Sequence, residues 1–282
     1  MKSLVIYCYL ESEQTKDNLT FFLRNGVFDS DKYHYEFIIN NLQCSVEFPP
    51  YQNINVHRRN ENSFDFYTYK WFIEKMGDEY FSDYSRIYFI NSSCIGPFMS
   101  VACSPNWIDN FNDLLIDYQL VGPVIEIPDD NLGLLALGIN STKNIPFIHT
   151  YMFGVNQVGF SIINNVFKTI TSNDCNKLEA IYNIERQITS AILMNEGKVK
   201  SLLVRFKHID LNKEENWDFR KWNTPNTPSC YEVPKNYFKM DLNPFEIVFI
   251  KNIRNENEAR PKERSGISSE LSLCLNNYSQ WS

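Results

Sequence analysis

The 282-residue sequence lacks features that define several large classes of protein. It contains no run of the roughly 18 to 20 apolar residues that a membrane-spanning helix needs. Basic residues are not in excess, because 27 Lys and Arg stand against 34 Asp and Glu, for a net charge of −7. Binding to nucleic-acid phosphates needs a basic face, so we expect no nucleic-acid partner. A Ser elbow and paired catalytic carboxylates are also missing, which disfavours the common hydrolases.

Cysteine chemistry has little support in the sequence. The seven cysteines are scattered and include no CxxC pair. This is typical of buried thiols in a reducing compartment, and it disfavours a disulfide framework or a zinc site. The apolar run 3–10 breaks at Glu11, so we expect a strand there and not a signal peptide. These observations predict a cytoplasmic protein.

Hydrophobic residues make up 43% of the chain and aromatic residues 15%, which is enough for a large core. In the first half, short apolar runs alternate with helical patterns in units of roughly 30 residues, which predicts an α/β fold with a mainly parallel central sheet flanked by helices. In such sheets ligands bind at the carboxyl ends of the strands. The expected strands are 3–10, 35–40, 54–58 and 86–90, and the expected helices are 18–27 and 64–76.

The second half is less regular. A long loop is expected at 128–143, and a polar, mobile tail beyond residue 252. The expected helices are 107–115, 157–169 and 178–195, and the expected extended segments are 119–127, 147–153, 199–206 and 246–251.

The expected strand 86–90 ends abruptly in Asn91, Ser92 and Ser93, and a Gly-Pro turn follows at 96–97. In nucleotide-sugar transferases of the A-type fold, the corresponding strand ends in Asp-x-Asp, which holds a divalent cation against the donor diphosphate. Here neutral oxygens stand in place of the carboxylates. One interpretation is a donor site without strong metal ligands, and the other is a polar turn that binds nothing.

The order of several motifs resembles a family of glycosyltransferase-like proteins that includes bacterial rhamnan and rhamnose-glucose polysaccharide synthesis proteins and relatives encoded by large DNA viruses. The family's strand ending in Asn-Asp-Ser or Asn-Cys-Gly, followed by Gly-Pro-Phe, is similar to residues 91–98. The likeness runs in consistent order from residue 3 to about residue 255. Its other elements are an Arg, an Asn and Asp-Phe at 59–66, a His opening an aromatic strand at 149–153, a Tyr-Glu pair at 182–185, and a His-Pro-Tyr-Glu-like segment at 243–251.

This resemblance implies a single Rossmann-like domain of the A-type glycosyltransferase fold over 1–255. Its nucleotide-binding half would be 1–100 and its acceptor half 101–255, followed by the polar tail 256–282. The implied activity is transfer of a hexose or deoxyhexose, such as rhamnose, from a UDP-, GDP- or dTDP-sugar onto a glycan acceptor. The glycan would belong to a polysaccharide or a glycoprotein, and a viral member would work in the host cytoplasm.

Two alternatives to an enzyme remain open. A catalytically degenerate fold of this kind would bind a nucleotide or a glycan without turnover. A protein-only interaction module has no support beyond the high aromatic content. The oligomeric state is left open.

The resemblance implies a donor site formed by Tyr9, Asn40, Arg59, Asp65 and the strand end 91–93. Asp65 would bond the base or ribose of the donor, but a carboxylate at a helix start is also favoured by the helix dipole alone. Arg59 would bind phosphate, although surface ion pairs are the ordinary alternative for an exposed Arg.

Metal binding is expected to be weak or dispensable. Asn91 and Ser93 are the candidate ligands for Mn²⁺ or Mg²⁺, and Ser92 replaces the family's central Asp. A hydroxyl is a far weaker ligand than a carboxylate for these hard cations. Asp129 and Asp130 are the next carboxylates to consider.

Two residues are candidates for catalysis. An inverting transfer needs a general base for the acceptor hydroxyl, and Glu185 is the first candidate. Because it lies at the edge of the apolar face of its expected helix, it faces either solvent or the cleft. His149 would orient the acceptor or contact the diphosphate, and the alternative is a satisfied core histidine.

Overall fold

The computed structural model describes residues 2–61, 64–99, 106–127, 145–170, 184–218 and 242–252. The expected tail 256–282, the carboxylates Asp129 and Asp130, and Tyr182 of the expected Tyr-Glu pair lie outside these ranges.

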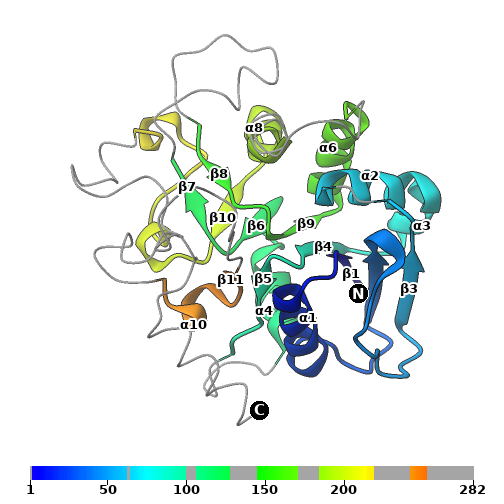
Figure 1. Ribbon diagram of the computed structural model, residues 1–282. Coiled ribbons are helices and arrows are strands. Elements are labelled where there is room, and N and C mark those ends of the chain that lie inside the picture. Colours follow the sequence, from blue (N-terminus) through cyan, green and yellow to red (C-terminus); the bar gives the residue numbers. More distant parts are fainter. Residues whose placement is uncertain are drawn as a thin grey trace, which may run out of the picture.

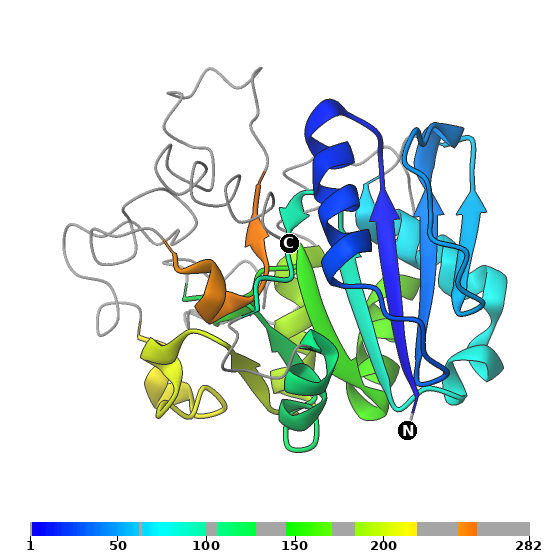
Figure 2. The same ribbon diagram turned by 90° about the horizontal axis from the view of Figure 1, so that it is seen from below.

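A seven-stranded sheet in the order β10-β6-β9-β4-β1-β2-β3 forms the centre of the protein. Pairs β4-β1, β1-β2, β2-β3 and β10-β6 are parallel, and β9 alone runs antiparallel between β4 and β6. Figure 2 shows β1, β2 and β3 pointing the same way. The strands are β1 (Ser3–Tyr9), β2 (Tyr33–Ile39), β3 (Ile54–Arg58), β4 (Arg86–Asn91), β6 (Leu120–Gly122), β9 (Met152–Asn156) and β10 (Val199–Ser201).

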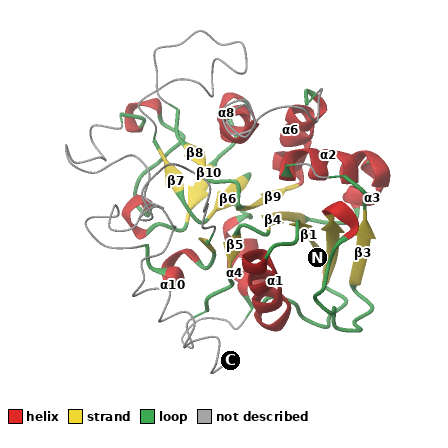
Figure 3. Cartoon of the chain, viewed as in Figure 1, coloured by secondary structure: helices red, strands yellow, loops and turns green. Residues whose placement is uncertain are grey.

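Helices cover both faces of this sheet (Figures 1 and 3). On one face lie α2 (Asp65–Met76), α3 (Asp78–Ser82), α6 (Gln157–Lys168) and α8 (Arg186–Met194). On the other face lie α1 (Glu13–Asn25) and α4 (Trp107–Leu114). The expected class, an α/β fold with a mainly parallel sheet between helices, is therefore confirmed.

Two small sheets extend the carboxyl side of the main sheet. In one, β11 (Ile250–Lys251) pairs antiparallel with β5 (Cys94–Ile95), directly after the end of β4. In the other, β7 (Ile125–Glu126) pairs antiparallel with β8 (Phe147–Ile148). The remaining short helices are η1 (Asn40–Leu42), η3 (Val204–Phe206), η4 (Glu214–Asn216) and α10 (Pro244–Ile247).

The aromatic residues fill the core on both sides of the central strands. Phe89 on β4 stacks on Phe153 of β9 with ring centroids 4.8 Å apart, and Tyr69 of α2 meets Phe89 edge to face at 5.0 Å. On the opposite face Trp107 of α4 packs against Tyr88 at 5.3 Å. Because alternate residues of β4 are anchored in both layers, the strand end that carries the polar motif is held firmly.

Several expected elements differ from the structure. The segment expected to be extended at 199–206 is a strand only at 199–201, and residues 204–206 form the helix η3. The helix expected at 18–27 starts earlier, at Glu13, because the Ser12 side chain accepts from Thr15 N and forms a capping box. The strand expected at 246–251 is wrong in its first part. Pro244 occupies the first turn of α10 and the Asn243 side chain caps it, so only the last two residues are extended.

The expected helix 178–195 is described only from residue 184 onward, and its regular part is α8. The segment expected to be extended at 147–153 is divided into β8 and β9 by a turn at residues 149–151. In the part of the chain that the structure describes, no helix is long and apolar enough to cross a membrane.

Candidate active site

Two polar side chains from different elements meet at the carboxyl end of β4. Asn91 is the last residue of β4, and Asp65 opens α2 on the helical layer above. The Asn91 amide donates to Asp65 Oδ2 at 2.5 Å. The Asn91 amide oxygen in turn accepts from Ser93 N at 3.0 Å and from the Ser93 hydroxyl. The expected strand-end motif and the expected start of the helix therefore form one hydrogen-bonded unit.

The Asp65 carboxyl has a pKa above its usual value. Burial is the main cause, and the negative charge of Glu185 adds to it. The bonds from Asn91 and from Phe66 N and the positive charge of Lys251 act in the opposite direction. The pKa therefore places Glu185 and Lys251 in the electrostatic environment of Asp65, although both are far from it in the sequence.

Glu185 is held by Thr150, in the turn that precedes β9. Both the backbone N–H and the hydroxyl of Thr150 donate to Glu185 Oε1, at 3.0 and 2.9 Å. Among the described residues, Glu185 Oε2 has no hydrogen-bond partner. Glu185 immediately precedes α8 and already has helical backbone dihedrals. One oxygen is thus fixed and the other remains available to a ligand.

His149 lies beside this unit but faces a different partner. Its Nε2 lies 3.1 Å from Glu126 Oε2, and both side chains are buried. Its ring packs against Phe147 at 5.0 Å and Tyr151 at 6.3 Å. This environment favours the interpretation of His149 as a satisfied core residue. Its link to the cluster is through the chain, because the next residue, Thr150, binds Glu185.

Asn40 and Arg59 lie below the strand ends. The Asn40 amide is fully buried and donates to Cys8 Sγ at 3.3 Å and to Thr68 Oγ1 at 3.1 Å. Arg59 donates to Thr68 Oγ1 at 3.4 Å and forms an ion pair with Glu61. Asn40 and Arg59 therefore both contact Thr68 of α2, so these two predicted donor-site residues lie close to each other.

Tyr9 and Ser92 also have partners inside the protein. The Tyr9 hydroxyl donates to Glu11 Oε2 at 3.2 Å, and its ring is fully buried. Ser92 is buried, and its carbonyl accepts from the Asn18 amide of α1 at 2.9 Å. Ser92 thus connects the end of β4 to α1, and its hydroxyl lies 3.5 Å from Leu10 N.

The described residues at the end of β4 do not form a set of ligands for a resident divalent cation. Asn91 and Ser93 offer neutral oxygens that already bond each other. Among the described residues, no group of three or more His, Cys, Asp or Glu side chains is arranged to hold a metal. Mg²⁺ and Mn²⁺ favour several hard oxygen ligands with negative charge.

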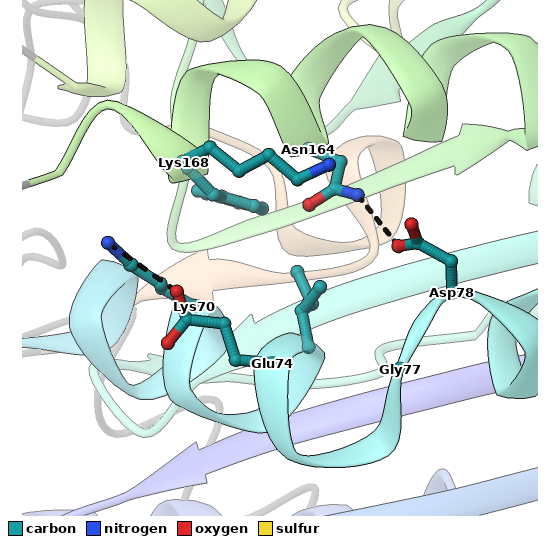
Figure 4. Close-up of a pocket in the computed structure, with 8 residues that line it drawn as sticks. Lys70, Glu74, Gly77, Asp78, Asn164 and Lys168 are labelled. Atoms are coloured by element: carbon teal, nitrogen blue, oxygen red, sulfur yellow. Dashed lines mark hydrogen bonds and ion pairs between the residues drawn. The ribbon is translucent and has the colours of Figure 1, made fainter.

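A groove of about 260 Å³ lies between α2 and α6 (Figure 4), and its lining includes none of the residues of the strand-end cluster. Across it, Asn164 donates to Asp78 at 3.2 Å, and on the α2 side Lys70 and Glu74 form an ion pair at 3.6 Å. Lys70 also donates to the carbonyl of Ile170. These polar groups satisfy one another, so the groove supports the packing of α2 on α6 and suggests no ligand.

Four of the sequence-predicted residues thus come together, namely Asp65, Asn91, Ser93 and Glu185. The sequence analysis missed Thr150, Glu126 and Lys251. Thr150 follows His149 directly, Glu126 ends an expected extended segment, and Lys251 ends the segment similar to the family's His-Pro-Tyr-Glu. Sequence position alone could have drawn attention to each, but not to its partner.

No protein-family model matches the sequence, and no curated protein matches it. Among solved structures, the chain is similar to the bifunctional glycosyltransferase WbbM in its apo form, with 10% identity over 72% of this chain and 39% of that one, at a TM-score of 0.38. It is also similar to the mannosyltransferase PcManGT from Pyrobaculum calidifontis, solved with GDP-Man and Mn²⁺, with 10% identity, 71% and 54% coverage and a TM-score of 0.43.

The chain spans less than two thirds of either neighbour, at 39% and 54% of their lengths. Both neighbours are glycosyltransferases by description. Likeness of this degree does not carry their donor, metal or acceptor over to this protein. The relation to rhamnan synthesis and viral proteins stays a prediction from the sequence.

Proposed function

We propose that the protein is a glycosyltransferase that moves a sugar from a nucleoside diphosphate donor onto a glycan acceptor. The observation that carries this proposal is the convergence of Asp65, Asn91 and Glu185 at the carboxyl end of parallel strands, where ligands of such sheets bind. The motif order along the sequence supports the same activity. Rhamnose-like sugars, and a role in polysaccharide or glycoprotein glycan synthesis, are part of the proposal.

In this proposal Asp65 and Asn91 bind the donor, and Glu185 acts on the acceptor. In an inverting transfer the acceptor oxygen attacks the anomeric carbon while the bond from that carbon to the diphosphate oxygen breaks. The nucleoside diphosphate leaves with the bonding electrons, and the acceptor proton passes to Glu185 Oε2. Thr150 keeps the carboxylate oriented through Oε1 during this step.

A second candidate function is a degenerate protein of the same fold that binds a nucleotide or glycan without turnover. The neutral oxygens at the strand end favour this alternative, because they cannot hold a cation firmly. Both candidates predict nucleotide binding, and only the first predicts transfer.

The first test is thermal unfolding with UDP-, GDP- and dTDP-sugars, each in EDTA and in Mn²⁺. A ligand present at 100 times its Kd stabilises the native state by about 2.7 kcal/mol, which is easily measured. If no nucleotide raises the Tm under either condition, both donor-binding proposals are wrong.

The second test is transfer by Glu185→Gln, with the exposed Glu196→Gln beyond the other end of α8 as the matched control. Loss of the base should lower turnover roughly 100-fold or more while donor affinity stays within a few-fold. The control should keep the wild-type rate. Wild-type turnover in Glu185→Gln would exclude it as the base.

A further inference from the structure

The charge of the donor diphosphate must be balanced within the proposed donor site. A nucleoside diphosphate brings negative charge to a place where the charge of Glu185 already acts on Asp65. Glu185 is bonded by Thr150, the next residue Tyr151 accepts from Asn91 N at 3.0 Å, and Asn91 bonds Asp65. Like charges at short range in a partly buried site repel each other strongly. A donor site of this kind therefore needs a positive group, and the strand end supplies no set of ligands for a resident cation.

Lys251 is the last residue of β11, and β11 is fixed against the strand-end motif. Lys251 lies opposite Cys94 in the antiparallel pairing of β11 with β5. The next residue, Asn252, donates its backbone N–H to the Ser93 carbonyl at 2.7 Å. The Asn252 side chain also donates to Asn18 at 3.0 Å and accepts from Gln14 at 3.1 Å. The backbone of Lys251 is therefore fixed beside the end of β4.

The positive charge of Lys251 also acts on the Asp65 carboxyl. It is among the groups that lower the pKa of Asp65, against the raising effects of burial and Glu185. The residue is half-buried. A lysine ammonium is a compact point charge on a flexible stem, and it binds phosphate well without fixed bidentate geometry.

We propose that Lys251 binds the donor diphosphate and supplies the positive charge that a divalent cation supplies in metal-dependent transferases. This inference rests on the proposed nucleotide-sugar function and names the group that meets the leaving diphosphate. The geometry that carries it is the pairing of β11 with β5, which fixes Lys251 beside Asn91–Ser93 and the two carboxylates. Donor binding is then independent of added metal.

The test is calorimetric binding of the nucleoside diphosphate that gives the largest thermal shift, in EDTA, for wild type, Lys251→Met and Lys251→Arg. Lys251→Met keeps the length and the strand but removes the charge, and we expect a Kd at least 10-fold higher. Lys251→Arg keeps the charge, and its Kd should stay within about 3-fold of wild type. Lys168→Met, on the exposed part of α6, is the matched control and should bind as wild type does.

Binding of the corresponding nucleoside, which lacks the phosphates, separates a phosphate contact from a disturbed fold. Lys251→Met should leave nucleoside affinity unchanged. Three results would each overturn the proposal. Lys251→Met could lose the same affinity for the nucleoside as for the diphosphate, or it could bind the diphosphate as tightly as wild type. The wild-type protein could also bind the diphosphate only when Mn²⁺ is present. If the wild type binds no nucleotide at all, the proposed function fails first, and that outcome is distinct from these three.

Discussion

Glu36 on β2 is a fully buried carboxylate outside the candidate active site, and it permits a sharp prediction about stability. Its Oε1 accepts from Asn55 at 2.8 Å and from the Tyr80 hydroxyl at 2.5 Å, and its Oε2 lies 2.5 Å from His57 Nε2. Lys75 Nζ lies 3.1 Å from His57 Nδ1. Because an ammonium can only donate, Nδ1 accepts from it, and in the neutral ring Nε2 carries the proton to Glu36.

We expect Glu36→Gln to lower the free energy of unfolding at pH 7 by about 3 kcal/mol. Hydrogen bonds to a charged group contribute about 1.5–3 kcal/mol and neutral ones about 0.5–1.5 kcal/mol, so three bonds lose roughly 1 kcal/mol each. For a chain of this size about 2–3 °C is lost per kcal/mol, which gives a fall in Tm of roughly 6–9 °C. The exposed Glu79→Gln on α3 is the matched control and should change stability by less than about 0.5 kcal/mol.

The effect depends on pH in a definite direction. Burial raises the pKa of Glu36, but the bonds from His57, Tyr80 and Asn55 outweigh it and hold the pKa below its usual 4.5. A carboxyl whose pKa is lower in the folded state than in the unfolded state stabilises the protein fully at a pH above its unfolded-state pKa. This stabilisation is lost as the pH falls through the folded-state pKa.

The difference in the free energy of unfolding between wild type and Glu36→Gln should therefore have its full value at pH 6–7 and decrease below about pH 4.5. Urea unfolding followed by tryptophan fluorescence at pH 7, 5, 4 and 3 measures it. A loss under about 1 kcal/mol at pH 7, or one that stays constant to pH 3, would refute the reasoning.

Three further predictions concern other parts of the protein. Asp65→Ala should weaken nucleotide binding by about 1–3 kcal/mol in calorimetry while the fold is kept, and unchanged affinity would leave Asp65 as a helix-start charge only. Gly159→Ala in α6 would bring a Cβ to 2.1 Å from the Gln119 carbonyl oxygen, so urea unfolding should show a loss of about 1–3 kcal/mol in the free energy of unfolding. At a helix position with room for the methyl group, the same substitution would increase stability. Burial raises the pKa of the Cys8 thiol to about 12, so peptide mapping after iodoacetamide at pH 8 should find it unmodified in the native protein and modified in urea.

The sequence predicted the first four strands well because their signals are local. β1, β2 and β4 are short, buried, mainly apolar runs, and the mostly exposed β3 was predicted at its observed bounds, 54–58. The meeting of Asp65 with Asn91 was also within reach, since both follow from strand and helix ends at one edge of a parallel sheet.

The antiparallel course of β9 and the partners of Glu185 and His149 could not be predicted in this way. Glu185 is fixed by Thr150, 35 positions earlier, and His149 meets Glu126, 23 positions earlier. No periodicity in the chain encodes these pairings, because they depend on how β7, β8 and β9 pack together. The position of Lys251 could not be predicted from the sequence either, because it depends on the pairing of β11 with β5.

Arg59 illustrates the difference between choosing a residue by type and by its surroundings. By type it is the obvious phosphate ligand of the donor half. In the structure its side chain is only 5% exposed, pairs with Glu61 and lies over the Trp71 ring at 4.9 Å. Its backbone carbonyl also accepts from Leu42, which has a left-handed φ of 58°, so Arg59 helps to hold a strained turn.

These contacts give Arg59 a supporting role at the end of β2. Lys251 on β11 is half-buried, acts on the Asp65 carboxyl, and its neighbour Asn252 bonds Ser93. If Lys251 binds the diphosphate, as proposed, substitutions in the segment 242–252 should alter donor binding more than substitutions at Arg59 do. Wild-type donor affinity in Lys251→Met together with a loss in Arg59→Met would reverse this order.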